Sequence, residues 1–452
     1  MGGFMISRNR KIISFLFITG SLISWLAVLT CPLQAMPPVQ KMTLPNHLVL
    51  LVSEDHSLPF VTIQFLVDSG SRRDPPEQEG LAYLTARGLL LGTAKRTAVQ
   101  INEELDFIGA VLNASSGRDY ATVSLRVLKK DLDKGLNLLI EAMTQPTFPE
   151  DEIRREIEKT LAGIQSAEDQ PGEVAEKEFQ KALFLKNPYG HPVEGTKESI
   201  PRLKRENLFH FFKTYYHPDN IILTIVGDMT LEEVKAKIRP RLEEWPANEI
   251  PKESFDITFA KEPKTIKIDR AITQANIILG HAGVSRGNPD YYAINIMNYI
   301  LGGGGFASRL TEEIRNKRGL AYAVESYFDP GKYPGGFQVV LQTKNASARE
   351  AISLTLEQME RIRKEPVSEK ELEGAQKYLI GSFPTRFDTQ AKLANFLTQI
   401  EYYGLGLDYP QKYPSLIRAI TREEILRVAK TYLHPENYIL VIVGNLKEAG
   451  LK

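Results

Sequence analysis

An internal repeat is the feature of this sequence that most constrains its fold. The segment KTYYHPDNIILTIVGDM (213–229) returns near the C-terminus as KTYLHPENYILVIVGNL (430–446). Each copy is expected to form the end of a helix, a turn, and a buried strand that stops at glycine. Solenoid units recur about every 20–50 residues, so a spacing this long indicates two copies of a whole domain.

The composition between the copies suggests where the domains meet. The stretch 246–265 is rich in Pro and Lys and has no sustained periodicity, so we expect a linker there. The first domain is then 36–245 and the second 266–452. A chain of 452 residues is too long for one ordinary core, which agrees with two domains.

Both halves mix strands with amphipathic helices. FVTIQFLV (60–67) is mostly apolar. YATVSLRV (120–127) instead alternates between apolar and polar residues, which is typical of a half-buried strand in an antiparallel sheet. AREAISLTLEQMERIRK (348–364) has helical periodicity. The expected fold class is α+β, with two homologous domains that are each a mainly antiparallel sheet with helices packed on one face.

The first 35 residues have the pattern of an export signal. A basic start is followed by an uncharged, mostly apolar run (12–29), and Ala35 is a small residue suited to a cleavage position. We expect a signal peptide over 1–35 and an exported, periplasmic protein. Two alternatives stay open: the run is just long enough to remain as a membrane anchor, and Cys31, which follows Thr30, could carry a lipid.

Charge and cysteine content exclude some classes of function. Lys+Arg and Asp+Glu number 56 each, so no net charge draws the chain to nucleic acid or to an anionic membrane. Cys31 is the only cysteine. A chain cleaved after Ala35 would therefore have neither a disulfide nor thiolate chemistry.

The segment GLAYLTARGLLLGT (80–93) has the outline of a metal-binding helix without the ligands. The positions where ligands are expected hold Tyr83, Ala86 and Arg87. No two of the seven histidines are three to five residues apart. Without paired histidines or cysteines, a transition-metal site has weak support.

The run of glycines in LGGGGFASRL (301–310) does not have the context of a phosphate-binding loop. A helix rather than a strand is expected before the glycines, and no Gly-Lys-Ser/Thr follows. We expect a flexible or closely packed backbone segment here.

Several motifs together carry a resemblance to a known family. They are VDSGSRRDPPEQEGLAYLTARGLLLGT, IGAVLNASSGRDYATVSL, AEDQP, NPYGHPVEG, the HPDNIILTIVGD repeat and GGGGFASRLTEEIRNKRGLAYAV. In this order, over nearly the whole mature chain, they resemble the insulinase/pitrilysin-type metallopeptidases, in the branch that includes the mitochondrial processing peptidase. The resemblance implies two domains arranged as half of a clamshell.

The resemblance also implies that a zinc site has been lost. Active members carry His-x-x-Glu-His on a helix of the first domain and a further Glu on a later helix. The alignment puts Tyr83 and Arg87 at the two histidines, Ala86 at the general base and Gly163 near the third ligand. Glu156 keeps a carboxylate where the family has an additional Glu. We therefore expect no metal in this chain, and zinc in a partner subunit.

Arg87 has two interpretations. It could fill the place of the cation and pair with Glu156, or it could extend to solvent.

A second implied feature lies in RNKRGLAY (315–322). Active assemblies of the family need an Arg and a Tyr from the half opposite the zinc, and these fall on Arg315 and Tyr322. The pair could hold the substrate backbone and stabilise a developing oxyanion. The alternative is a surface arginine in a charge cluster with Lys317 and Arg318, and a core tyrosine.

These features predict the zinc-free subunit of an exported heterodimeric metallopeptidase. Its partner would be a paralogue with the zinc motif, and an unfolded peptide would bind as an added strand, where Asn113 and Ala114 match the family's strand start. The alternatives are a non-catalytic, chaperone-like peptide-binding protein and a scaffold subunit. An independent metallopeptidase is disfavoured by residues 83, 86 and 87.

Overall fold

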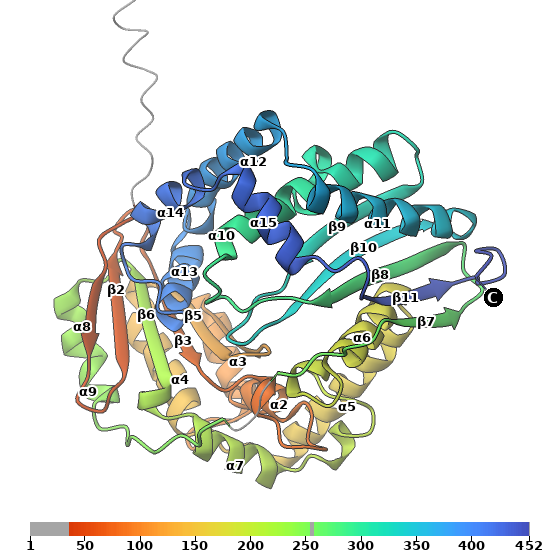
Figure 1. The fold of residues 1–452 in the computed structure, drawn as a ribbon. Helices are drawn as coiled ribbons and strands as arrows, with labels where there is room; N and C mark the ends of the chain where they lie inside the picture. Colours follow the sequence, from red (N-terminus) through yellow and green to blue (C-terminus); the bar gives the residue numbers. More distant parts are fainter. Residues whose placement is uncertain (1–35, 254–256, 452) are drawn as a thin grey trace, which may run out of the picture. The chain divides into compact units, whose positions relative to one another are not determined.

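The computed structural model of the chain contains two β-sheets that repeat one strand order (Figure 1). It describes residues 36–253 and 257–451. The expected signal peptide, 1–35, lies outside the described residues. The domain boundaries drawn from the sequence stay a prediction; in the structure, 38–452 group into one unit by their contacts.

The two sheets place the repeated strand at the same position. In each sheet that strand has a parallel neighbour on one side and an antiparallel one on the other. The order in the first sheet is β1 (Gln40–Thr43), β2 (Val49–Glu54), β6 (Ile221–Gly227), β3 (Phe60–Val67), β5 (Ala121–Leu128), β4 (Val111–Ser116). The order in the second sheet is β7 (Lys264–Asp269), β11 (Ile439–Gly444), β8 (Gln274–Ala282), β10 (Gly336–Lys344), β9 (Ala321–Phe328). The α+β class with two homologous, mainly antiparallel halves is confirmed.

The strands follow the hydrophobic patterns that predict them. β5 buries Ala121, Val123, Leu125 and Val127 and leaves the residues between them partly or fully exposed, as its alternation requires. β3 is buried along nearly its whole length, because elements of the structure cover both of its faces.

Each half supplies its own helices to one face of its sheet. In the first half these are α2 (Leu81–Gly88), α3 (Ala98–Ile108), α4 (Leu132–Thr144), α5 (Glu150–Glu168) and α7 (Arg205–Tyr215), with the short α8 (Leu231–Lys237) and α9 (Arg239–Leu242) near its end. In the second half they are α10 (Tyr291–Asn298), α11 (Ala348–Lys364), α12 (Glu369–Ser382), α14 (Tyr409–Arg418) and α15 (Arg422–Tyr432).

Two helices are exchanged between the halves. α6 (Pro171–Phe184), from the first half, packs on β8 and β11 of the second sheet. Its Phe179 lies against Gly280, where an added Cβ would come within 2.6 Å of the ring. α13 (Gln390–Tyr402), from the second half, packs on β3 and β6 of the first sheet (Figure 1). There Thr398 donates a hydrogen bond to Thr224 at 2.9 Å.

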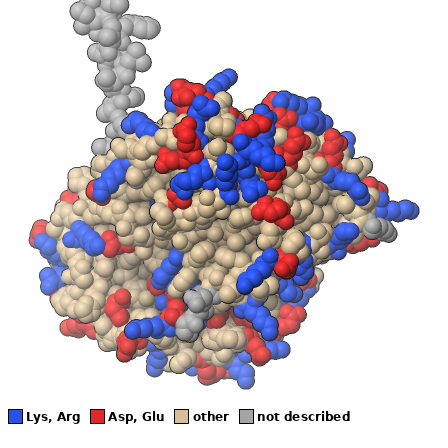
Figure 2. Space-filling model, in the orientation of Figure 1, with Lys and Arg blue, Asp and Glu red and all other residues tan. Residues whose placement is uncertain are grey.

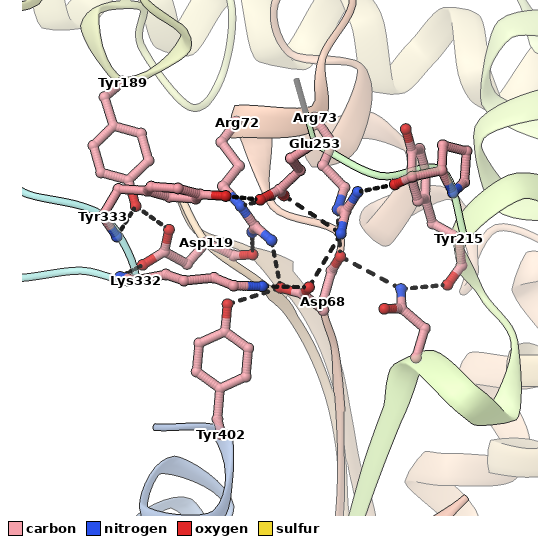
Figure 3. A network of polar contacts seen from close by, with 12 residues as sticks. Asp68, Arg72, Arg73, Asp119, Tyr189, Tyr215, Glu253, Lys332, Tyr333 and Tyr402 are labelled. Atoms are coloured by element: carbon pink, nitrogen blue, oxygen red, sulfur yellow. Dashed lines mark hydrogen bonds and ion pairs between the residues drawn. The ribbon is translucent and has the colours of Figure 1, made fainter. Parts of the chain in front are cut away.

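Asp68, directly after β3, is the centre of a polar network that joins the two halves (Figure 3). Its carboxylate accepts hydrogen bonds from Arg72 at 2.5 Å, from Lys332 at 2.8 Å and from the Tyr402 hydroxyl at 2.7 Å. Lys332 lies in the β9–β10 turn and Tyr402 ends α13. Burial alone would raise the pKa of Asp68, but the charges of Arg72 and Lys332 hold it well below its usual range.

Asp119, in the β4–β5 turn, extends this network. Its side chain accepts from the Tyr189 hydroxyl and, at 2.7 Å, from the backbone N–H of Lys332. Its backbone oxygen accepts from Arg72, whose side chain is fully buried. Arg72 also pairs with Glu253 at 2.7 Å, so a segment of the expected linker is tied to the same cluster.

On the face shown in Figure 2, positively and negatively charged side chains are interspersed, so charge of one sign does not dominate that face. Within the part of the chain that the structure describes, no helix combines the length and the apolar character that crossing a bilayer requires.

We predict that Asp68→Asn destabilises the fold by about 3 kcal/mol at pH 7, because the buried Arg72 keeps only Glu253 as a counter-charge and Lys332 loses its carboxylate partner. Urea unfolding measures this. Since the folded pKa of Asp68 is depressed, its contribution is present above its unfolded pKa of about 4 and is lost as the pH falls through the folded value. The difference from wild type should therefore shrink in acid.

Asp329→Asn is the matched control. Asp329 pairs with Arg118, also across the halves, but its side chain is 50% exposed, so its loss should cost less than about 1 kcal/mol. Equal effects of the two substitutions would contradict the central role of Asp68.

Candidate functional site

The α2 helix is held in place at its first turn. The Asp74 carboxyl group accepts hydrogen bonds from the backbone N–H groups of Gly80 and Ala82, both at 2.8 Å. These bonds satisfy two donors that a helix start leaves without partners. α2 then packs against α5 and α7, which brings the degenerate metal positions close to Glu156.

The sequence-predicted metal positions do not form a ligand set. Ala86 is fully buried in the core. The Arg87 guanidinium donates to the Glu156 carboxylate and lies 5.5 Å from the centre of the Tyr83 ring. Burial raises the pKa of the Tyr83 phenol, so it is neutral at pH 7 and a poor ligand for zinc. The predicted pairing of Arg87 with Glu156 is present.

Gly163 contributes nothing that could replace a ligand. It lies on α5, and open space surrounds the position where a Cβ would be. Across residues 36–253 and 257–451, no group of three or more His, Cys, Asp or Glu side chains is arranged to hold a metal ion. The remaining carboxylate, Glu156, is already neutralised by a fixed positive charge. The donor chemistry at α2 and α5 therefore does not fit zinc.

The two residues of the predicted Arg/Tyr pair lie together. Arg315 is in a π-helical turn, η8 (Thr311–Asn316), and Tyr322 is in β9. The guanidinium carbon of Arg315 lies 5.6 Å from the centre of the Tyr322 ring. π-Helical turns occur frequently at functional sites.

Tyr322 is presented to solvent by a break in strand pairing. Ala323 pairs with Gln342 and Ala321 with Thr343, so Tyr322 is the extra residue of a β-bulge. Bulges re-aim side chains and are common near active sites. Tyr322 is 75% exposed. The alternative of a core tyrosine is therefore wrong.

Phe306 is a third member of this group that sequence reasoning missed. It is 72% exposed, and its ring centre lies 4.7 Å from the Arg315 guanidinium. Two aromatic rings, of Phe306 and Tyr322, therefore lie near the guanidinium. The signal available in the sequence was a phenylalanine directly after four glycines. The first three glycines are closely packed: a Cβ on Gly302, for example, would lie 2.4 Å from the Ser326 hydroxyl.

The charges around Arg315 leave it available to a ligand. Lys317 and Arg318 both pair with Glu313, at 2.7 and 2.9 Å. Arg315 makes no ion pair with any residue that the structure describes. Two neighbouring cations are therefore neutralised, and the Arg315 guanidinium is not.

Asn113 and Ala114 lie on β4, at the edge of the first sheet. They pair with Ser124 and Val123 of β5, and no other strand among the described residues pairs with β4. One edge of β4 can therefore accept an added strand. In the second sheet the equivalent edge strand is β9, which carries Tyr322.

Two family models match the chain. Residues 49–197 match insulinase (peptidase family M16), and residues 202–379 match the peptidase M16 inactive domain. The second match contains both Arg315 and Tyr322.

Several known proteins are similar along most of the chain. A protein named an uncharacterized zinc protease from Rickettsia bellii is 30% identical over 71% of this chain and 80% of its own length. A non-peptidase homolog, YmxG of Helicobacter pylori, is 25% identical over 88% and 92%. A probable mitochondrial-processing peptidase subunit beta of Arabidopsis thaliana is 24% identical over 91% and 79%.

A solved structure has the same fold. The crystal structure of a peptidase M16 inactive domain from Pseudomonas fluorescens matches with a TM-score of 0.85 and 28% identity, over 90% of this chain and 98% of that one.

We predict that Arg87→Met lowers the free energy of unfolding by about 2 kcal/mol, because it leaves the buried Glu156 carboxylate without a partner. Chemical denaturation measures the loss. A double variant with Glu156→Met should recover part of it.

Arg154→Met on α5 serves as the control. Its ion pair with Asp151 is between side chains that are 68% and 73% exposed, so the change should be about 0.5 kcal/mol or less. Full stability of Arg87→Met would instead favour an arginine that extends to solvent.

Proposed function

The chain belongs to the insulinase (M16) peptidase family, and from this premise we propose that it is the zinc-free subunit of an exported heterodimeric metallopeptidase. It supplies Arg315 and Tyr322 to the active site of a paralogous partner that binds zinc. The observation that carries the proposal is the half-buried Arg315 beside the exposed Tyr322, because this guanidinium has no counter-ion among the described residues.

The contrast between the two sites supports this assignment. At α2 an arginine is neutralised by Glu156 where a cation would be bound. In η8 the half-buried Arg315 lies near the rings of Phe306 and Tyr322 and has no ion pair with a described residue. A chain with the first site alone could serve as a scaffold, but a scaffold has no need for the second.

The chemistry of the pair suits a peptide carbonyl. A guanidinium and a phenol both donate hydrogen bonds, and such donors stabilise the charge that develops on a carbonyl oxygen. The charged guanidinium gives the stronger interaction. The Phe306 ring adds an apolar surface beside it. These groups hold and polarise the substrate, and bond cleavage takes place at the partner's metal.

Peptide substrates fit the edge strands of the fold. An extended peptide can add to β4 through its backbone, beside Asn113 and Ala114. An unfolded segment meets this requirement, whereas a folded domain does not. The basic and apolar start of the sequence motivates the proposal that the protein acts after export, in the periplasm.

A peptide-binding protein without catalytic function is the second candidate. The similarity to a relative named a non-peptidase homolog favours it. The two candidates differ in what the Arg315–Tyr322 pair does: only a catalytic subunit should change the rate of peptide cleavage by a zinc-bearing partner.

We predict that Arg315→Ala or Tyr322→Phe lowers the turnover of the reconstituted pair by about 10²–10³-fold, the range seen for loss of one oxyanion donor. The assay mixes each variant with the paralogue that carries His-x-x-Glu-His and follows hydrolysis of an unstructured peptide. Association, measured by analytical ultracentrifugation, should be unchanged.

Arg318→Ala and Tyr378→Phe are the matched controls. Arg318 is paired with Glu313, and Tyr378 is exposed on α12 at 56%, so both should keep full activity. Wild-type turnover by the Arg315 and Tyr322 variants would reject their role in catalysis and favour the peptide-binding protein.

A further inference from the structure

A pocket in the C-terminal half combines basic and aromatic side chains. It lies between α10, α13 and α14 and has a volume of about 490 Å³, a size common for small-molecule sites. Arg315, Tyr322 and Phe306 are not part of its lining. Ligand binding here therefore does not depend on the proposed function or on a zinc-bearing partner.

The floor of the pocket is apolar and aromatic. Phe396, Ile400 and Tyr409 are all buried, and Tyr291 and Tyr403 line the sides. Burial raises the pKa of the Tyr403 and Tyr409 phenols above their ordinary value, so both stay neutral at pH 7. This surface can receive a flat or branched apolar group.

Three cations line the same pocket: Arg286, Arg386 and Lys392. The residues that the structure describes provide no aspartate or glutamate in the lining. Lys392 is paired with Asp388 at 2.8 Å, outside the lining. Neither arginine has an ion pair with a described residue, so two guanidinium charges face the pocket without a counter-ion.

Contacts with aromatic rings explain where these two arginines lie, but they do not use the remaining N–H donors of the guanidinium groups. The Arg286 guanidinium stacks 3.8 Å from the centre of the Tyr291 ring and donates one bond of 3.2 Å to the Tyr409 hydroxyl. Arg386 lies 5.5 Å from the Phe383 ring. A guanidinium has five N–H donors in a planar fork, and stacking on a ring fixes the plane of that fork while leaving its edge available.

We propose that this pocket binds a small organic carboxylate with an aromatic or branched apolar body. The body lies on the floor formed by Phe396, Ile400 and Tyr409, and the carboxylate accepts paired hydrogen bonds from Arg286 and Arg386. The side-chain amides of Asn395 and Gln399, which also line the pocket, suit an amide group of the ligand. N-acylated amino acids and the C-terminal residues of peptides share this chemistry.

Calorimetric titration of the full chain tests the proposal with N-acetylphenylalanine and its uncharged amide. The carboxylate should bind at least tenfold more tightly than the amide. A tetrapeptide that ends in phenylalanine, with a free or an amidated C-terminus, distinguishes a peptide end from a small free acid. Tighter binding of the free-ended peptide than of N-acetylphenylalanine assigns the site to peptide ends, and the reverse assigns it to small acids.

Substitutions connect the binding to the pocket. Arg386→Gln and Arg286→Gln should each weaken binding of the carboxylate about tenfold and leave binding of the amide unchanged. Arg418→Gln, at the exposed end of α14 and outside the lining, should have no effect. Thermal unfolding checks that the variants are folded.

Three results would overturn the proposal. They are equal binding of acid and amide, wild-type affinity in both Arg286→Gln and Arg386→Gln, and absence of binding by every probe at millimolar concentration.

Discussion

The Asp68 carboxylate, whose side chain is only 17% exposed, makes the interactions on which the rest of this structure depends. It lies where the first sheet ends and takes donors from its own half, through Arg72, and from the other half, through Lys332 and Tyr402. A carboxylate in this position is tolerated only when it is fully paired. The pairing ties the β9–β10 turn and the end of α13 to the first sheet.

The exchange of α6 and α13 also ties the two halves together, in this case through apolar contacts. Each half buries a helix that belongs to the other, so neither half completes its core alone. The duplicated halves have kept one architecture and have diverged in chemistry. The helix α2 has a neutralised arginine where the family's active members bind zinc. The second half keeps an arginine without a counter-ion among the described residues, beside an exposed tyrosine.

Local patterns in the sequence were sufficient for the fold class and for much of the site. The repeat predicted the equivalence of β6 and β11, and the apolar run at 60–67 has the bounds of β3. The pairing of Arg87 with Glu156 was one of two interpretations of a charge at a lost metal position, and the structure contains it. These features depend on short segments or on a family motif.

Features that depend on contacts between distant segments could not be predicted from the sequence. The amphipathic pattern of α13 does not reveal which sheet it covers, and it packs on the sheet of the other half. Nothing in RNKRGLAY indicates the bulge that exposes Tyr322, because the bulge is defined by pairing with β10. The contact of Phe306 with Arg315 likewise depends on how the glycine segment folds back.

The central claim is that this chain completes an active site whose metal is bound by another subunit. The most direct measurement titrates the zinc-bearing paralogue with this chain and records peptide hydrolysis together with the zinc content of each protein. The account predicts that the paralogue alone is nearly inactive, that activity saturates at one copy of this chain per paralogue, and that zinc stays with the paralogue. Stoichiometric zinc and peptide cleavage by this chain alone, or full activity of the paralogue without it, would contradict the account.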